Sequence, residues 1–344
     1  MAFCDDIEKI LLDKTLPQHD ELLTLVESCV SLLEDEDEKI RPKMSTERKN
    51  KKISGGLLDF RSVQQGRPVI VVPDLHARTY FLRDILNKKI FVGEQKTELS
   101  VLQCLEQELI YVVCVGDLFH SELRCYDRWK NAFLEYRKGN ILSDAMKEEM
   151  VENLRLLEMV IKTKLAFPSS FHFLKGNHEN ILNEEGRGNH SFYKMAREGS
   201  MVYDFMQEFY GDALLYIISC FEHALPICAV FNNLVVSHAE PYFTVGKTKI
   251  INYKKNPDVV LALTWTSNDS AERGSVSKSI RNLVGKNCRE VTWIGGHRPV
   301  RGKFALRQRG KYVQIHNPDE ENVAFVESGR KFNPESDIIS VGGN

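Results

Sequence analysis

The apolar run at residues 69–72, Val-Ile-Val-Val, constrains the fold of this chain more than any other feature. β-branched residues favour extended structure, so the run predicts a short strand that is buried on both faces. Pro73 cannot donate a ladder hydrogen bond, and the strand is expected to end there. Asp74 and His76 follow at the exit, where a carboxylate and an imidazole two positions apart can turn toward one point. They form half of a candidate metal site.

Four more predicted strands end in polar residues of the same kinds. The exits are Gly116-Asp117, Gly176-Asn177-His178-Glu179, His238 and His297. In α/β architectures, polar residues at strand ends gather on one edge, where binding sites form. Carboxylates, imidazoles and an amide oxygen, without thiolate, suit Mn²⁺, Fe²⁺ or Zn²⁺. Five such exits in one chain favour a shared metal centre over five unrelated residues.

The order of elements predicts an α/β fold with a helical extension at its start. Residues 1–60 read as two helices divided by Pro17 and followed by a charged linker. The core is expected at 67–330, with a helical insertion at 126–165 and a C-terminal tail at 331–344. Early strands alternate with helices and later ones do not, which favours a mixed sandwich over a doubly wound parallel sheet. The later strands are predicted at 213–220, 227–231, 234–237, 290–294, 312–316 and 322–326.

Composition argues against a nucleic-acid-binding, a membrane-spanning or a disulfide-rich protein. The 344 residues are 42% hydrophobic and carry a formal net charge of -2, so no global positive field recommends nucleic acid as a partner. No apolar run approaches the roughly 20 residues that span a bilayer. The eight cysteines are scattered without CxxC pairs, which predicts reduced thiols. These features predict a soluble cytoplasmic protein with no membrane partner.

The polar strand exits also carry a family resemblance. The series Asp74-x-His76, Gly116-Asp117, Gly176-Asn177-His178-Glu179, His238 and Gly296-His297 resembles the calcineurin-like metallophosphoesterases. Within them it is most similar to the phosphoprotein phosphatase branch and its bacterial relatives, which include diadenosine tetraphosphate hydrolases. Gly-Asn-His-Glu is the most specific segment. The resemblance covers about 67–326 and implies a sandwich of two mixed β-sheets flanked by helices.

The resemblance implies a role for each exit residue. Asp74 and His76 would bind a first metal, Asp117 would bridge, and the second metal would be held by Asn177, His238 and His297. Two divalent ions, Mn²⁺ and/or Fe²⁺/Zn²⁺, would generate a hydroxide near neutral pH and neutralise phosphoryl charge during its attack on phosphorus. His178 would be the general acid for the leaving oxygen, with Glu179 supporting the loop.

One motif departs from the family pattern. Where the family continues Gly-Asp-x-x-Asp-Arg-Gly, this chain has His120, Ser121 and Glu122 after Phe119. Three interpretations compete: His120 hydrogen-bonds or directly contacts the substrate phosphate, Glu122 takes over the orienting role, or the site is weakened or inactive. The first two are favoured together, because every inferred metal ligand is retained. Without the family's arginine at this position, the candidate phosphate-binding residues are Arg78, Arg124 and Arg298.

These observations predict a binuclear metal-dependent phosphoesterase that hydrolyses a phosphate monoester. A phosphorylated protein, dephosphorylated at serine or threonine, is the first choice of substrate, and a small phosphoester is also compatible. A diadenosine polyphosphate or nucleotide hydrolase is the rival enzyme. A non-catalytic metal-binding module that meets a protein partner through the helical extension is the alternative of another class.

Overall fold

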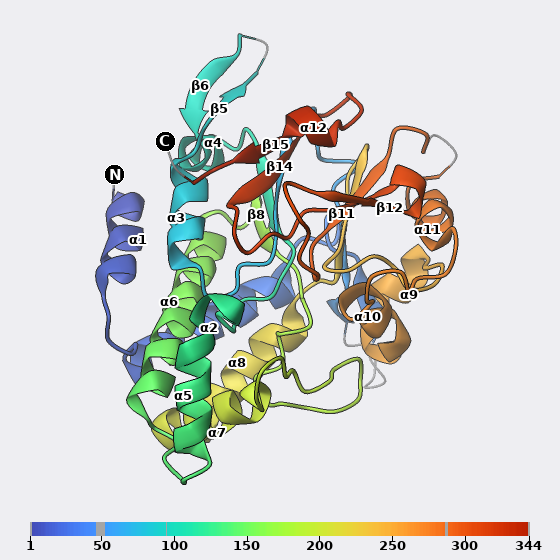
Figure 1. Cartoon of the computed structure of the whole chain (residues 1–344). Helices are drawn as coiled ribbons and strands as arrows, with labels where there is room; N and C mark the ends of the chain where they lie inside the picture. The colour runs from blue at the N-terminus through green and yellow to red at the C-terminus, as the bar shows by residue number, and fades with distance from the viewer. Residues whose placement is uncertain (1, 46–51, 94, 286–287, 343–344) are drawn as a thin grey trace.

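Two mixed β-sheets form the centre of the structure, and helices cover the outer face of each (Figure 1). The computed structural model describes residues 2–45, 52–93, 95–285 and 288–342. The layered arrangement confirms the predicted mixed α/β sandwich. Two-stranded hairpins lie outside these sheets, namely β1 (Lys43–Ser45) with β2 (Lys52–Ser54) and β5 (Lys89–Val92) with β6 (Thr97–Ser100).

The first sheet has five strands in the order β15-β14-β4-β7-β8. Its three parallel strands are β4 (Val69–Val72), β7 (Tyr111–Cys114) and β8 (Phe171–Phe173). The antiparallel strands β14 (Asn322–Val326) and β15 (Ile338–Ser340) complete one side. Both faces of β4 are buried, because Val69 and Val71 pack between the sheets while Ile70 and Val72 pack against helices. This double burial explains the uninterrupted apolar run.

The second sheet has six strands in the order β12-β13-β11-β10-β9-β3. The strands are β3 (Leu57–Asp59), β9 (Cys228–Val230), β10 (Leu234–Val236), β11 (Thr292–Gly295), β12 (Ala305–Arg307) and β13 (Tyr312–Gln314). Strands β10, β11 and β13 run parallel to one another. Their carboxyl ends therefore share one edge of the sheet, which places His238 and His297 together.

Helices form two outer layers. The first sheet is covered by α1 (Ala2–Leu12), α2 (His19–Asp35), α3 (Thr79–Asn87), α4 (Val101–Glu106), α5 (Tyr126–Tyr136), α6 (Asp144–Ala166), α7 (Glu198–Tyr210) and α8 (Asp212–Ala224). The second is covered by α9 (Lys247–Ile251), α10 (Pro257–Thr264) and α11 (Ser275–Val284). Short elements complete the chain, namely η1 (Glu122–Cys125), η2 (Tyr253–Lys255), η3 (Gln308–Gly310) and α12 (Pro334–Asp337).

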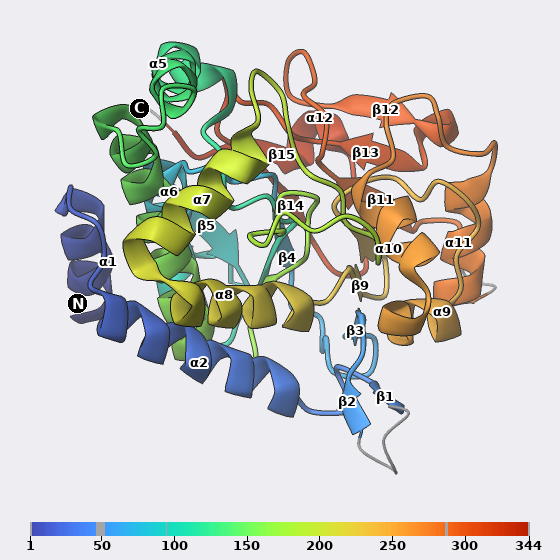
Figure 2. The same ribbon diagram turned by 90° about the horizontal axis from the view of Figure 1, so that it is seen from below.

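The helices of the expected N-terminal extension pack into the same core as the first sheet. Figure 2 shows α2 lying along α8, and its residues Leu22, Val26 and Cys29 are buried in the helical layer. Strand β3, placed by the sequence in the linker before residue 67, pairs with β9 in the second sheet. Part of the expected linker, 46–51, lies outside the described residues, as do 343–344 of the expected tail.

One predicted strand is wrong. The apolar run 213–220 lies in α8, a helix, and not in a sheet. Leu214, Leu215, Ile218 and Phe221 lie on the buried side of this helix, at the three- and four-residue spacing that a helix requires. A short apolar run carries little information about period, and here helical burial against α2 decided the outcome.

Unfolding tests whether the N-terminal helices belong to the cooperative core. We expect Leu22→Ala to lower the free energy of unfolding by about 2–5 kcal/mol, because it leaves a cavity in that core. Leu12→Ala, at a leucine that is 69% exposed, is the matched control and should change it by less than about 0.5 kcal/mol. Urea denaturation followed by circular dichroism measures both. A wild-type midpoint for Leu22→Ala would show that these helices fold independently.

Candidate metal centre

The carboxyl ends of strands from both sheets meet at one buried site. Strands β4, β7 and β8 supply residues from the first sheet, and β10, β11 and β13 supply residues from the second. Three groups of potential metal ligands are buried there: Asp74, His76 and His316; His76, Asp117 and His178; and Asp117, His238 and His297. All five predicted strand exits therefore converge.

Asp117 lies between the two halves of this site. Its Oδ2 is 3.5 Å from His76 Nε2 on one side and 3.5 Å from His238 Nε2 on the other. Its Oδ1 accepts a hydrogen bond of 2.9 Å from the backbone N–H of His178. A carboxylate held between imidazoles from opposite sides is positioned to be shared by two ions, the role that the sequence predicts for it.

Asn177, His238 and His297 form a tight triangle of ligand atoms on the second side. Asn177 Oδ1 is 2.9 Å from both His238 Nε2 and His297 Nδ1, and the two nitrogens are 3.1 Å apart. Atoms bound at about 2.0–2.2 Å to one ion lie roughly 2.9–3.6 Å from one another, because tetrahedral and octahedral angles set that spacing. The triangle has the dimensions of half of a coordination shell.

The backbone around the site is held in conformations that favour function over local stability. His76, Asp117 and His297 have φ of 44°, 56° and 70°, in the left-handed region that side chains other than glycine seldom adopt. Glu179 fixes two of the loops by accepting backbone N–H groups from Asp117 and from Gly176. Strained conformations of this kind persist where the surrounding contacts over-determine them.

Glycines let the carboxylates sit against neighbouring backbone. A Cβ atom at Gly296 would collide with Asp74 Oδ1, and one at Gly176 would collide with Asp117 Oδ1. Asp74 also accepts hydrogen bonds from the backbone N–H of His297, at 3.1 and 2.9 Å. The two glycines thus belong to the site although neither offers a ligand atom.

The charges of the buried groups fit divalent cations. Burial lowers the pKa of His238 to about 4, and it holds the pKa values of His76, His178 and His297 well below their usual range, which leaves neutral imidazoles with free lone pairs. Burial, with Asp74 and Glu179 nearby, raises the pKa of Asp117 well above its usual range. A bound cation would relieve this carboxylate crowding, so the residues present fit the two ions that the sequence predicts.

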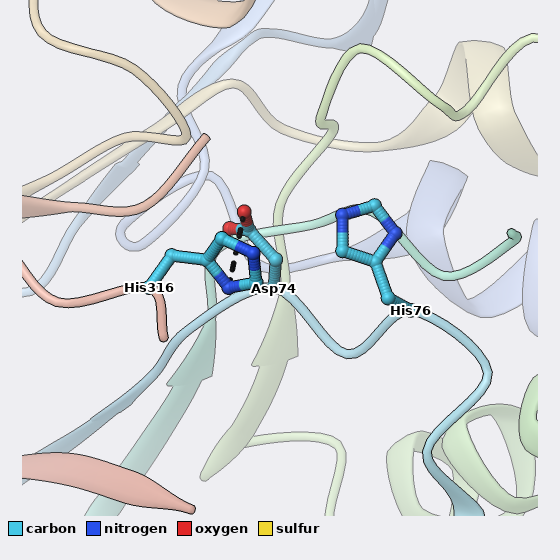
Figure 3. A group of neighbouring side chains, drawn as sticks. All are labelled: Asp74, His76 and His316. Carbon is cyan, nitrogen blue, oxygen red and sulfur yellow. Dashed lines mark ion pairs between the residues drawn. The ribbon is translucent and has the colours of Figure 1, made fainter. Parts of the chain in front are cut away.

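His316 is a site residue that the sequence analysis missed. It follows β13, is completely buried, and lies beside Asp74 with His76 nearby, as Figure 3 shows. Its Nδ1 is 3.5 Å from Asp74 Oδ2. Neither ring nitrogen has a hydrogen-bond partner among the described residues. The sequence carries a signal for it, because the predicted strand at 312–316 ends at His316, a polar residue of the same kind as the other candidate ligands.

Glu122 reaches the same side of the site. Its Oε1 is 3.4 Å from His76 Nε2, and its Oε2 is 3.3 Å from His316 Nε2. The ammonium group of Lys194 donates to Glu122 Oε1 at 2.6 Å. Burial alone would raise the pKa of Glu122, but the imidazoles and the Lys194 ammonium outweigh it and hold the pKa well below its usual range.

His120 is fully buried next to the candidate metal centre. Its ring stacks on Trp129, with centroids 4.8 Å apart, and its Nε2 is 3.6 Å from Glu198 Oε1. Its Nδ1 accepts the backbone N–H of Glu122 at 3.0 Å. The ring centroid is 5.4 Å from that of His178. Of the three alternatives for the departing motif, direct contact of His120 with phosphate is the one that this position disfavours.

A cavity of about 530 Å³ opens beside His178 and the second set of ligands. Among the predicted phosphate-binding residues, Arg298 lines it, and Lys194, which the sequence did not single out, lines it too. Arg78 points its guanidinium at backbone carbonyls, including that of Leu75 at 3.1 Å. Arg124 pairs with Glu152 at 2.9 Å. The structure brings only Arg298 of the three to the cavity, and phosphate binding by all three stays a prediction.

Comparison of the sequence with models of known protein families identifies the family of this chain. The model of the calcineurin-like phosphoesterase family matches residues 67–301, more than half of the chain. The chain belongs to the calcineurin-like phosphoesterases. Membership in this family makes it a metal-dependent phosphoric ester hydrolase.

Solved structures are similar to this chain at low sequence identity, and the first of them, with a TM-score above 0.5, shares its fold. A Saccharomyces cerevisiae protein serine/threonine phosphatase with similarity to human phosphatase PP5 is 14% identical, with a TM-score of 0.54 over 94% of this chain and 89% of that one. A cold-active protein-tyrosine phosphatase of a psychrophilic Shewanella is 12% identical, with a TM-score of 0.42 over 83% and 82%. A candidate diadenosine tetraphosphatase is 15% identical, with a TM-score of 0.38 over 84% and 98%. No curated protein sequence matches this chain.

Two findings bear on the predicted surroundings of the enzyme. The structure describes all eight cysteines, and each of them is free. None of the helices in the described ranges has both the length and the apolar run that crossing a lipid bilayer requires.

The glycine that accommodates Asp74 offers a test of the site. We expect Gly296→Ala to lower the number of divalent ions bound per chain, because the new Cβ displaces the Asp74 carboxylate. Gly246→Ala is the matched control, since its Cβ would meet open space. Mass spectrometry of metal content after dialysis against Mn²⁺ measures both. Full metal content in Gly296→Ala would contradict the assignment of Asp74 as a ligand.

Proposed function

We propose that this calcineurin-like phosphoesterase removes phosphate from serine and threonine side chains of proteins, using two divalent ions. The observation that supports this most is the position of His178, which lies in one ligand group with His76 and Asp117 and also lines the cavity. The Gly-Asn-His-Glu segment, which resembles the phosphoprotein phosphatase branch, supports it too. Free cysteines agree with a cytoplasmic enzyme that meets phosphorylated proteins.

The ions would be held by residues from both sheets: Asp74 and His76 on the first side, Asp117 shared, and Asn177, His238 and His297 on the second. When bound, such ions neutralise phosphoryl oxygens and supply an activated water for attack on phosphorus. The backbone carbonyl of Phe119 accepts from His76 Nδ1 at 3.2 Å, which directs the Nε2 lone pair into the site. Manganese, iron and zinc all suit these ligand types.

In this proposal His178 protonates the leaving oxygen. Its ring packs on Phe192, with centroids 4.5 Å apart, and its Nδ1 has no hydrogen-bond partner within the described part of the chain. Burial and the Lys194 ammonium lower its pKa, so the imidazole is neutral in the free site. An arriving phosphate dianion adds negative charge beside the ring and raises that pKa, which favours the protonated donor in the bound state.

Lys194 and Arg298 are the cationic side chains that line the cavity. Lys194 extends from the segment after Gly-Asn-His-Glu, and Arg298 follows His297 and donates to Ser267 Oγ at 3.1 Å. Neither guanidinium nor ammonium is fully enclosed by protein partners, so both can approach an incoming phosphate. They would replace the arginine that the family carries where this chain has Ser121.

Substrates with different leaving groups test whether His178 is a general acid. We expect His178→Ala to lower kcat for a phosphoserine peptide by about 10²–10⁴-fold, because a serine alkoxide needs a proton to depart. The loss should be much smaller for p-nitrophenyl phosphate, whose phenolate leaves unaided. His223→Ala, outside the cavity, is the control. Equal losses on both substrates would show that His178 positions the site and does not donate a proton.

Lys194 provides a second test of phosphate binding. We expect Lys194→Gln to lower kcat/KM for the phosphopeptide by about 10–100-fold, since one charge-assisted hydrogen bond contributes about 1.5–3 kcal/mol. Lys147→Gln, at a partly exposed lysine in the first turn of α6 that does not line the cavity, should leave kcat/KM unchanged. Steady-state kinetics with Mn²⁺ measures both, and an unchanged value for Lys194→Gln would assign the phosphate to other groups.

A dinucleoside polyphosphate hydrolase is the second candidate, favoured by two aromatic side chains at the same cavity. Trp265 lines its wall, and Tyr193 lines it while being 76% exposed, so either ring can stack on a purine base. Hydrolysis of diadenosine tetraphosphate without turnover of phosphopeptide would select this function. Absence of turnover on any phosphoester, with every divalent ion, would instead select a non-catalytic binding role.

A further inference from the structure

Glu122 and His316 lie beside Asp74 and His76, the candidate ligands of the first metal, without forming good hydrogen bonds to them. His316 is 0% exposed and Glu122 is 6% exposed, yet both nitrogens of His316 lack a hydrogen-bond partner among the residues described. The distances of 3.3 to 3.5 Å from Glu122 and Asp74 to the imidazole nitrogens exceed those of good hydrogen bonds. Buried polar atoms left in this way are costly unless another partner completes them.

We propose that Glu122 and His316 are additional ligands of the first metal ion, beyond the set that the family resemblance implies. Glu122 Oε1 lies 3.4 Å from His76 Nε2, Glu122 Oε2 lies 3.3 Å from His316 Nε2, and Asp74 Oδ2 lies 3.5 Å from His316 Nδ1. Each of these three distances falls within the range of roughly 2.9–3.6 Å expected for atoms that share one ion, and His316 would give one of its two nitrogens to it. The inference rests on the metal requirement of the proposed function, and not on the identity of its substrate.

The departing motif explains how a carboxylate reaches this position. The backbone N–H of His120 donates to Asn153 and that of Ser121 to Glu149, which anchors the segment on α6. The Ser121 hydroxyl also donates to Glu149, at 2.6 Å. With φ of 82° at His120 and 55° at Glu122, the chain turns the Glu122 side chain toward His76. Where the family places a cationic arginine and a glycine, this chain therefore places an anchoring serine and an inward carboxylate.

The extra ligands make the two metal positions unequal. The first ion would face three carboxylates, Asp74, Asp117 and Glu122, with two imidazoles, whereas the second would share Asp117 and otherwise meet only neutral ligands. Anionic oxygens bind divalent ions more strongly than neutral donors do. The first position is thus the tighter one, and Lys194 holds the Glu122 carboxylate in place from the cavity side.

Calorimetric titration of Mn²⁺ into the full-length, chelator-stripped protein tests this directly. The wild type should show a tight and a weaker binding step. We expect Glu122→Gln and His316→Gln each to weaken the tight step by at least about 10-fold, while the weaker step changes less than about threefold. His297→Gln should do the reverse, because His297 lies on the second side. Glu152→Gln and His172→Gln, at a carboxylate and a buried imidazole away from the site, should alter neither step.

Two wild-type-like steps in both Glu122→Gln and His316→Gln would overturn the proposal. Circular dichroism of the metal-free variants shows whether each is folded, and Glu122→Asp, which keeps the charge but shortens its reach, replaces any variant that is not. Because binding is read without turnover, the outcomes separate. An inactive protein whose tight step depends on Glu122 refutes the proposed function alone, and an active phosphatase whose tight step ignores Glu122 refutes this inference alone.

Discussion

The structure depends on a group of buried imidazoles and carboxylates that cannot satisfy one another. His76, His238 and His178 approach the single oxygen Asp117 Oδ2 at 3.5, 3.5 and 3.9 Å, which are too long for good hydrogen bonds. Burial keeps these imidazoles neutral and raises the pKa of Asp117. Cations bound between these groups would accept the lone pairs of the imidazole nitrogens. They would also offset the repulsion that Asp74 and Glu179 exert on Asp117. The centre is therefore built for ions and is electrostatically incomplete without them.

The short, doubly buried strands of the two sheets hold the metal-ligating residues in place. Strands of only three or four residues carry the ligands, and each is buried on both faces between a second sheet and a layer of helices. Short strands place their exits close to the packed core, so the ligand loops inherit its rigidity. Glu179 binds two of those loops together through backbone N–H groups, and Gly176 and Gly296 allow the carboxylates to lie against the backbone.

The sequence predicts most of the centre because its ligands follow strong local signals. Asp74, Asp117 and Asn177 come directly after buried apolar runs, and that order alone indicates a shared edge. His316 follows β13 in the same way, but the family pattern has no counterpart to it, so the resemblance does not indicate it. The sequence points to Glu122 only as a residue that would orient the general acid, and no local signal indicates a metal ligand there. Its position depends on left-handed backbone at His120 and Glu122 and on anchoring by α6, which are tertiary effects.

Anomalous X-ray diffraction from crystals grown with Mn²⁺ tests the two-ion centre most directly. The account predicts two strong peaks about 3.5–4 Å apart, on opposite sides of Asp117, one beside Asp74 and His76 and the other beside Asn177 and His297. A single peak, or peaks away from Asp117 at saturating Mn²⁺, would contradict it.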